Sequence, residues 1–165
     1  LGDVYKRQVW LRSSGAGSDY LALHDRPSIT QVKATQQASA AAYKAAGITA
    51  NDVDLAEVHD CFTIAELMAT EDLGFAQHGE GGLFAREQRG VRNQGDVCIN
   101  PSGGLKSKGH PLGATGTGQA VEVFKQLRGS VEEARQIRDA EVGITHNVGG
   151  SGATCAVHVF GRDRA

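Results

Sequence analysis

Glycine is concentrated in two short stretches of this sequence, and its placement restricts the folds that the chain can adopt. Of the 22 glycines among 165 residues, six fall between Gly103 and Gly118 and three more within residues 149–152. Glycine is favoured where the backbone adopts a positive φ or passes close to another group. We therefore expect both stretches to be loops with a binding role or sites of tight packing.

Short apolar runs predict the strands of the domain. They are expected at Leu55–His59, Cys98–Asn100, Val142–His146 and Thr154–Phe160. The last two are apolar on both faces, which is typical of central strands in a sheet. Val9–Leu11 makes a short apolar start, and the following RSSGAGSD is expected to be a loop.

Helical periodicity separates these strands. Helices are expected at Thr30–Ala46, from Thr63 to Gly74 with Ile64, Leu67 and Met68 inward, and up to Gly129 with Ala120, Val123, Phe124 and Leu127 on one face. Ser28 with Gln31, and Thr63 with Glu66, have the spacing of capping boxes, and Gly47 suits the C′ position. Residues 77–95 are expected to form a partly helical surface excursion. The resulting order, βαβα(β)αββ, describes an α/β domain.

Composition favours a single domain and argues against some classes of binding partner. A length of 165 residues with 40% hydrophobic content suits a single core. The formal net charge of -2 shows no basic face for nucleic acid or anionic membrane, and no apolar run is long enough to span a bilayer. Three widely spaced cysteines favour free thiols in a reducing compartment. Without an initiator Met or a signal peptide, the sequence is expected to be a cytoplasmic fragment.

Side chains capable of chemistry collect in three segments that each follow a predicted strand. These are VHDCF at 58–62, PSGGLKSKGHPLGATG at 101–116 and HNVGGSG at 146–152. In open α/β sheets, ligands bind where the carboxyl ends of strands and the N-termini of helices gather. We therefore expect His59, Cys61, His110 and His146 to converge. If the strand continues through His59 and Cys61, both point to the same side, because side chains alternate with a period of two.

Simpler interpretations compete for these residues. A zinc site built from the same four side chains would show only half of the usual ligand-pair spacing, so no metal is expected. Residues 104–111 lack the Lys-Ser/Thr pair that a phosphate loop needs after its second glycine, and the glycine spacing at 113–118 is the reverse of a dinucleotide fingerprint. The remaining residues of these types are interpreted as surface or packing groups: His24, His78, His158, Cys98 and Cys155.

The three segments together resemble motifs of the thiolases. NPSGGLKSKGHPLGATG resembles the GHP motif in its full glycine context, VHDCF is similar to the HDCF motif of sterol carrier protein-type thiolases and archaeal acetyl-CoA acetyltransferases, and HNVGGSG resembles the HNxG segment of that branch. The resemblance covers residues 9–165 and is to the C-terminal half of a thiolase. Residues 1–8 fall outside it and are expected to be a non-family leader. The resemblance implies a mixed five-stranded sheet with helices in the order βαβαβαββ.

The same resemblance implies a role for each candidate residue. His59 and His110 would donate hydrogen bonds to the thioester oxygen that becomes an enolate, and Cys61 would move the α-proton as acid and base. The backbone N–H of Gly149 would contribute to a second oxyanion hole. His110 would also lower the pKa of a nucleophilic cysteine in the N-terminal half. His146 and Asn147 stand where other branches carry a second cysteine motif, and are expected to support the site.

Substrates and partners follow from this resemblance. CoA thioesters are expected as substrates, in Claisen condensation or in thiolytic cleavage of 3-ketoacyl-CoA, with no permanently bound cofactor. The expected partners are an N-terminal thiolase half and further copies in a homo-oligomer. Nothing in the sequence resembles that N-terminal half, so this chain alone is expected to be inactive. The alternatives are a thiolase-like aldol lyase, a decarboxylating ketosynthase and a non-catalytic lipid-binding, acyl-CoA-binding or assembly subunit; an intact His59-x-Cys61 counts against the first two.

Overall fold

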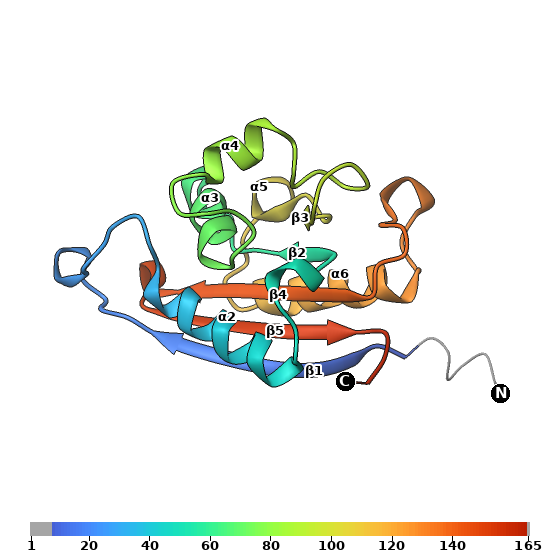
Figure 1. Ribbon diagram of the computed structural model, residues 1–165, viewed down its shortest axis with the longest axis horizontal. Helices are drawn as coiled ribbons and strands as arrows, with labels where there is room; N and C mark the ends of the chain where they lie inside the picture. Colours follow the sequence, from blue (N-terminus) through green and yellow to red (C-terminus); the bar gives the residue numbers. More distant parts are fainter. Residues whose placement is uncertain (1–7, 165) are drawn as a thin grey trace.

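The sheet of this domain has five strands of mixed direction. The computed structural model describes residues 8–164. Its strands are β1 (Trp10–Ser18), β2 (Leu55–Glu57), β3 (Cys98–Ile99), β4 (Val142–Gly149) and β5 (Thr154–Gly161), in the spatial order β1-β5-β4-β2-β3. β2 pairs in parallel with β3 and β4, whereas β5 pairs antiparallel with β4 and β1. The expected fold class, and the central position of the last two strands, are confirmed (Figure 1).

Helices cover both faces of this sheet. They are α2 (Lys33–Ala46), α3 (Thr63–Asp72), α4 (Gly81–Arg86), α5 (Gly104–Lys108) and α6 (Thr115–Arg128), with the 3-10 turns η1 (Leu23–Asp25), η2 (Ala50–Asp52), η3 (Glu133–Arg135) and η4 (Gly150–Gly152). α2 packs on β1 and β5, and α6 packs on β4 and β2. Two adjacent residues of β2 pack on opposite faces of the sheet. Ala56 belongs to the apolar cluster that includes α2, and Leu55 belongs to the cluster that includes α6. No helix among residues 8–164 has the length and apolar character needed to cross a bilayer.

β1 corrects a sequence-based prediction, because RSSGAGS at residues 12–18 is part of a strand and not a loop. Its glycines are where α2 comes closest to the sheet: a Cβ at Gly15 would lie 2.0 Å from the Ala38 carbonyl oxygen, and one at Gly17 would lie 2.1 Å from that of Ala34. Glycine lowers strand propensity but permits such an approach of two backbones. The small residues of β1, which are typical of a loop, are required here by the packing of α2 on the strand. The expected leader at residues 1–8 lies, apart from Gln8, outside the described residues.

Both predicted capping boxes are wrong. α2 begins at Lys33, and no side chain caps it; Asp72 instead accepts a hydrogen bond from the Val32 backbone N–H at 2.7 Å. α3 begins at Thr63, also without a side-chain cap, and the Glu66 carboxylate is bound by the Asn100 side-chain amide at 3.1 Å. Long-range contacts have therefore replaced the local caps. The predicted end of α2 at Gly47 is confirmed by its left-handed φ of 68°.

The predicted buried faces of two helices need correction. On α3, Ile64 is 60% exposed, and the buried residues are Ala69, Thr70 and Asp72. On α6, which ends before Gly129 as predicted, Val123 and Leu127 are buried but Phe124 is 37% exposed. The rest of the buried face of α6 consists of polar side chains, which an apolar pattern cannot detect: Thr115, Gln119, Glu122 and Gln126. The expected helical part of the excursion at 77–95 is α4.

Candidate active site

Three neighbouring strands bring the three motif segments to one edge of the sheet. β3, β2 and β4 are adjacent and parallel, so their carboxyl ends lie together. β2 ends at Glu57, earlier than the predicted His59, and the Asp60 N–H turns back onto the Val58 carbonyl at 3.1 Å. The alternation that would have aligned His59 with Cys61 therefore does not apply. β4 continues through Gly149, so HNVG belongs to the strand and does not follow it.

The rings of His59 and His110 are in contact. Their centroids are 4.8 Å apart and their planes meet at 89°. His59 is 8% exposed, and its Nδ1 is buried without a hydrogen-bond partner among the described residues. Burial lowers the pKa of His59, as does the charge of His110, while Asp60 acts in the opposite direction. A buried ring nitrogen without a partner is costly unless a bound group satisfies it.

His110 is oriented by the first residue of α6. Its Nδ1 lies 2.7 Å from Thr115 Oγ1, and the Thr115 hydroxyl donates to the Pro111 carbonyl oxygen at 3.2 Å. Because a hydroxyl has a single hydrogen, Nδ1 must carry the hydrogen of the contact with Thr115. In this Nδ1–H tautomer, Nε2 carries a lone pair. Sequence analysis missed Thr115, a small polar residue within the glycine-rich segment.

The His146 ring contacts the backbone of His59. Its Nε2 is 2.9 Å from Thr35 Oγ1, and its Nδ1 accepts a hydrogen bond from the backbone N–H of His59 at 3.4 Å. Complete burial, followed by the charge of His59, lowers the pKa of His146 to about 3, so its ring is neutral. With Nδ1 accepting, Nε2–H donates to Thr35. His146 thus supports the backbone of His59 from α2 and β4.

Gln119 on α6 binds the residue of β4 that follows His146, which is Asn147. It is fully buried, its Nε2 donates to the His146 carbonyl oxygen at 2.9 Å, and its Oε1 accepts from Asn147 Nδ2 at 3.2 Å. Asn147 is therefore fixed by a helix that follows the GHP segment in the chain. Sequence analysis missed Gln119; the signal was a polar residue four positions before Val123 on the predicted inner face.

Cys61 differs from the other two cysteines in its surroundings. It is half-buried in the turn between β2 and α3, and its thiol makes no hydrogen bond within the part of the chain that the structure describes. Cys98 and Cys155 are buried in β3 and β5, where burial raises the pKa of their thiols to about 12 and about 11. Their interpretation as packing residues is confirmed by this burial. Of the three cysteines, Cys61 alone is not buried, and it stands two residues after His59 in the chain.

Gly149 is the last residue of β4 and leads into a turn held by an arginine. Gly149 is extended, with φ at -123°, and the next three residues all have positive φ. Arg26 donates from Nη1 to the Ser151 carbonyl oxygen at 2.9 Å and from Nε to that of Tyr20 at 2.8 Å. This arginine joins the β1–α2 connection to the turn after Gly149. It is a further residue that sequence analysis missed.

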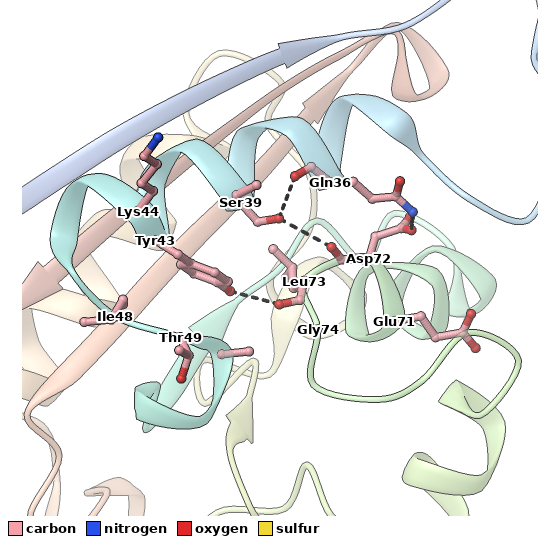
Figure 2. A pocket seen from close by; sticks show the side chains of 12 residues that line it. Gln36, Ser39, Tyr43, Lys44, Ile48, Thr49, Glu71, Asp72, Leu73 and Gly74 are labelled. Atoms are coloured by element: carbon pink, nitrogen blue, oxygen red, sulfur yellow. Dashed lines mark hydrogen bonds between the residues drawn. The ribbon is translucent and has the colours of Figure 1, made fainter.

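A groove on another part of the surface contains none of these residues. It has a volume of about 550 Å³ and is lined by α2, η2 and the end of α3 (Figure 2). The Tyr43 hydroxyl donates to the Leu73 carbonyl oxygen at 3.1 Å, and Ser39 Oγ lies 3.4 Å from that of Asp72. These hydrogen bonds join the two helices along the groove, which is a seam between α2 and α3 and separate from the histidine pair.

The mixed sheet, with His59 just after β2 paired to His110 between α5 and α6, defines a thiolase-type domain. Residues 15–162 match the family described as Thiolase C-terminal domain-like, and the chain belongs to this family. It is 53% identical over 154 residues to an acetyl-CoA acetyltransferase of Methanothermobacter thermautotrophicus, covering 93% of this chain and 40% of that protein. It is 45% identical over 120 residues to human sterol carrier protein 2, covering 72% of this chain and 21% of that protein.

Solved structures agree with this fold. The Ltp2-ChsH2(DUF35) aldolase superimposes with a TM-score of 0.81 at 22% identity, over 95% of this chain and 40% of the other. A monomeric SCP2-thiolase like protein type 1 from Mycobacterium smegmatis gives a TM-score of 0.70 at 19% identity, over 98% of this chain and 30% of the other. At these identities the likeness concerns the fold. The chain spans about two fifths or less of the length of each of these proteins.

Proposed function

We propose that this chain is the C-terminal catalytic part of a thiolase that forms or cleaves a carbon–carbon bond beside a CoA thioester. The observation that carries the proposal is the pair of rings of His59 and His110, 4.8 Å apart, with the buried Nδ1 of His59 left without a partner among the described residues. The archaeal relatives named acetyl-CoA acetyltransferases support the same reaction class. CoA thioesters are the proposed substrates, and an N-terminal thiolase half is the proposed partner in a homo-oligomeric protein.

The histidine pair suits the charge that develops in such a reaction. Removing the α-proton of a thioester places negative charge on its carbonyl oxygen, and preorganised donors at that oxygen are commonly the largest catalytic contribution. His59 supplies one N–H. His110 takes the proton of the nucleophilic cysteine on Nε2, and its Nε2–H is then the second donor. Its Nδ1 contact with Thr115 keeps the ring in the required tautomer.

Cys61 is the proposed acid and base of the carbon–carbon bond step. In condensation, its thiolate removes the α-proton of acetyl-CoA, and the enolate carbon attacks the acyl group carried by the nucleophilic cysteine. The resulting oxyanion is held by the Gly149 N–H, and collapse releases the cysteine thiolate with the 3-ketoacyl-CoA. In cleavage, Cys61 returns the proton to the leaving enolate carbon. The His146 ring accepts a hydrogen bond from the backbone N–H of His59, and the Asn147 side chain, two residues before Gly149, is held by Gln119 of α6.

Histidine variants of a complete protein carrying this chain and its N-terminal half test the proposal. His59→Ala should lower kcat for acetoacetyl-CoA thiolysis by roughly 10²–10³-fold, the usual cost of removing one oxyanion-hole donor. His110→Ala should also prevent formation of the acyl-enzyme, detected by intact-protein mass spectrometry. His24→Ala, at an exposed histidine, is the matched control and should keep parental activity. Parental thiolysis in both site variants would exclude the proposed reaction.

The alternatives predict other outcomes when the same complete protein is given an aldol substrate and its Cys61 is also substituted. A thiolase-like aldol lyase would cleave an aldol substrate and show no dependence on Cys61. A non-catalytic subunit would bind acyl-CoA without forming an acyl-enzyme. The contact of His59 with the histidine of the GHP segment, together with the intact His59-x-Cys61 sequence, supports the thiolase reaction over these two.

A further inference from the structure

A buried carboxylate lies directly before the histidine pair. Glu57, the last residue of β2, is 1% exposed. Its Oε1 accepts a hydrogen bond from the Ser102 N–H at 2.9 Å, and its Oε2 accepts from Ser102 Oγ at 2.7 Å and from Lys108 Nζ at 3.1 Å. Lys108 Nζ also lies 2.7 Å from Ser102 Oγ. Glu57 therefore contacts both the beginning and the end of the segment that leads to His110.

The two partners of this ion pair have the same spacing from the two rings. Glu57 stands two residues before His59, and Lys108 stands two residues before His110. The ion pair and the contact between the two rings thus connect the same two backbone segments, and the two contacts are two residues apart along each segment. A single residue therefore separates Glu57 from His59, and a single residue separates Lys108 from His110.

The segment before His110 needs such an attachment. α5 has only five residues, and its N-terminal end is fixed by Asp60, which accepts from the Leu105 N–H at 2.7 Å. Its C-terminal end passes through Gly109, whose φ is 83° and where an added Cβ would meet no atom within 4 Å. Glycine adopts this φ without strain, so one residue connects Lys108 directly to His110. Lys108 is the side chain that ties this end to β2.

We propose that Lys108, through its ion pair with Glu57, is a positioning residue that sets the distance and angle between the rings of His59 and His110. This inference rests on the proposed function for its catalytic meaning. An ion pair with one buried partner is weak evidence for stability: Glu57 is 1% exposed and Lys108 is 31% exposed, and desolvation of the Glu57 carboxylate offsets the attraction. A role in positioning accounts better for the ion pair of Glu57 and Lys108. The spacing of the two oxyanion donors must be held closely, because a misplacement of about 1 Å can cost 10²-fold in rate.

The test compares three lysine variants of this chain by NMR with ¹⁵N-labelled histidine. Lys108→Met removes the charge, Lys108→Arg keeps it, and Lys106→Met changes a neighbouring lysine of α5 whose side chain faces Phe62 instead of Glu57. We expect the nuclear Overhauser effect between the His59 and His110 rings to be lost in Lys108→Met and kept in the other two. The titration midpoint of His59 should shift in Lys108→Met alone. An unchanged ring contact and midpoint in a folded Lys108→Met would overturn the inference.

Further variants keep the outcome interpretable. Glu57→Gln preserves the shape of the side chain, and the double variant Glu57→Gln/Lys108→Met removes both charges without leaving one unpaired. If the pair acts as a unit, the double variant should lose the ring contact to no greater extent than Lys108→Met does. Retention of the ring contact in a folded double variant would overturn the inference even where Lys108→Met fails to fold.

The readouts separate this inference from the proposed function. In the complete protein, Lys108→Met should lower kcat by roughly 10- to 100-fold with little change in KM, and Lys108→Arg should restore it. Loss of the ring contact in a protein that has no thiolase activity would uphold the positioning role and refute the proposed reaction. Thiolase activity together with an undisturbed ring contact in Lys108→Met would do the reverse.

Discussion

The carboxylate of Asp60 lies directly against the α-carbon of Gly104. A Cβ at Gly104 would be 2.2 Å from Asp60 Oδ2, and the same carboxylate accepts hydrogen bonds from the Leu105 and Lys106 N–H groups at 2.7 and 3.4 Å. The turn after β2 and the segment before His110 therefore share one contact, in which a carboxylate caps a short helix and a glycine makes room for it. This contact fixes the backbones that carry His59 and His110.

Substitution of Gly104 should disrupt that contact. Gly104 has a φ of 67°, so Gly104→Ala adds both the clash with Asp60 and a left-handed alanine, which alone costs roughly 1–3 kcal/mol. We expect a lower free energy of unfolding in urea and a displaced His110 resonance. Gly113→Ala, in the same segment, meets no atom within 4 Å and is the matched control. Equal losses of stability in the two variants would show that the contact with Asp60 is unimportant.

The cysteines should differ sharply in reactivity. With pKa values of about 12 and about 11, Cys98 and Cys155 are ionised to only roughly 10⁻⁴ and 10⁻³ at pH 8, and both are shielded by the sheet. A disulfide exchange reagent should therefore modify one thiol rapidly in the folded chain, and mass spectrometry should place it at Cys61. All three thiols should react after unfolding. Rapid modification of Cys98 or Cys155 in the folded chain would contradict their packing in β3 and β5.

The buried ring of His146 should make stability depend on pH. In the unfolded chain this ring gains a proton near pH 6.5, whereas its lowered pKa keeps it neutral in the folded chain until about pH 3. Its contribution is therefore complete above pH 6.5 and is lost as the pH falls toward 3, by up to about 1.4 kcal/mol per pH unit.

His146→Gln should flatten this dependence, measured by urea unfolding near pH 7 and near pH 4.5. Burial raises the pKa of Glu57 and Asp72, so these carboxyls act in the opposite direction, but they are present in both proteins and cancel in the comparison. His24→Gln is the matched control at an exposed histidine. Equal slopes in the parent and His146→Gln would contradict the neutral, buried state of the ring.

Sequence patterns located most of the elements and the edge of the sheet where the histidines meet. The ends of α2 and α6 could be predicted because Gly47 and Gly129 adopt the left-handed conformation that glycine favours. β1 could not, because Gly15 and Gly17 are selected by contact with α2 and hide the strand pattern. Local propensity describes one segment at a time, whereas the close packing of α2 on β1 depends on the sequences of both segments.

The supporting residues of the candidate site were the least accessible to sequence reasoning. His59 and His110 stand in recognisable motifs, whereas Thr115, Gln119 and Arg26 act through hydrogen bonds that sequence patterns do not reveal. A threonine, a glutamine or an arginine is common at such positions, and only the folded arrangement of strands, helices and turns gives each its partner.

Exchange of the α-proton of acetyl-CoA is the most direct test of the proposed chemistry. In a complete protein carrying this chain and its N-terminal half, Cys61→Ala should still form the acyl-enzyme, because His110 and the nucleophilic cysteine perform that step. The same variant should lose the exchange of deuterium between methyl-deuterated acetyl-CoA and water, since the proposed base is gone. Mass spectrometry follows both steps in one sample. Loss of exchange with retained acylation is the result that we predict; exchange at the parental rate in Cys61→Ala would show that Cys61 is not the base.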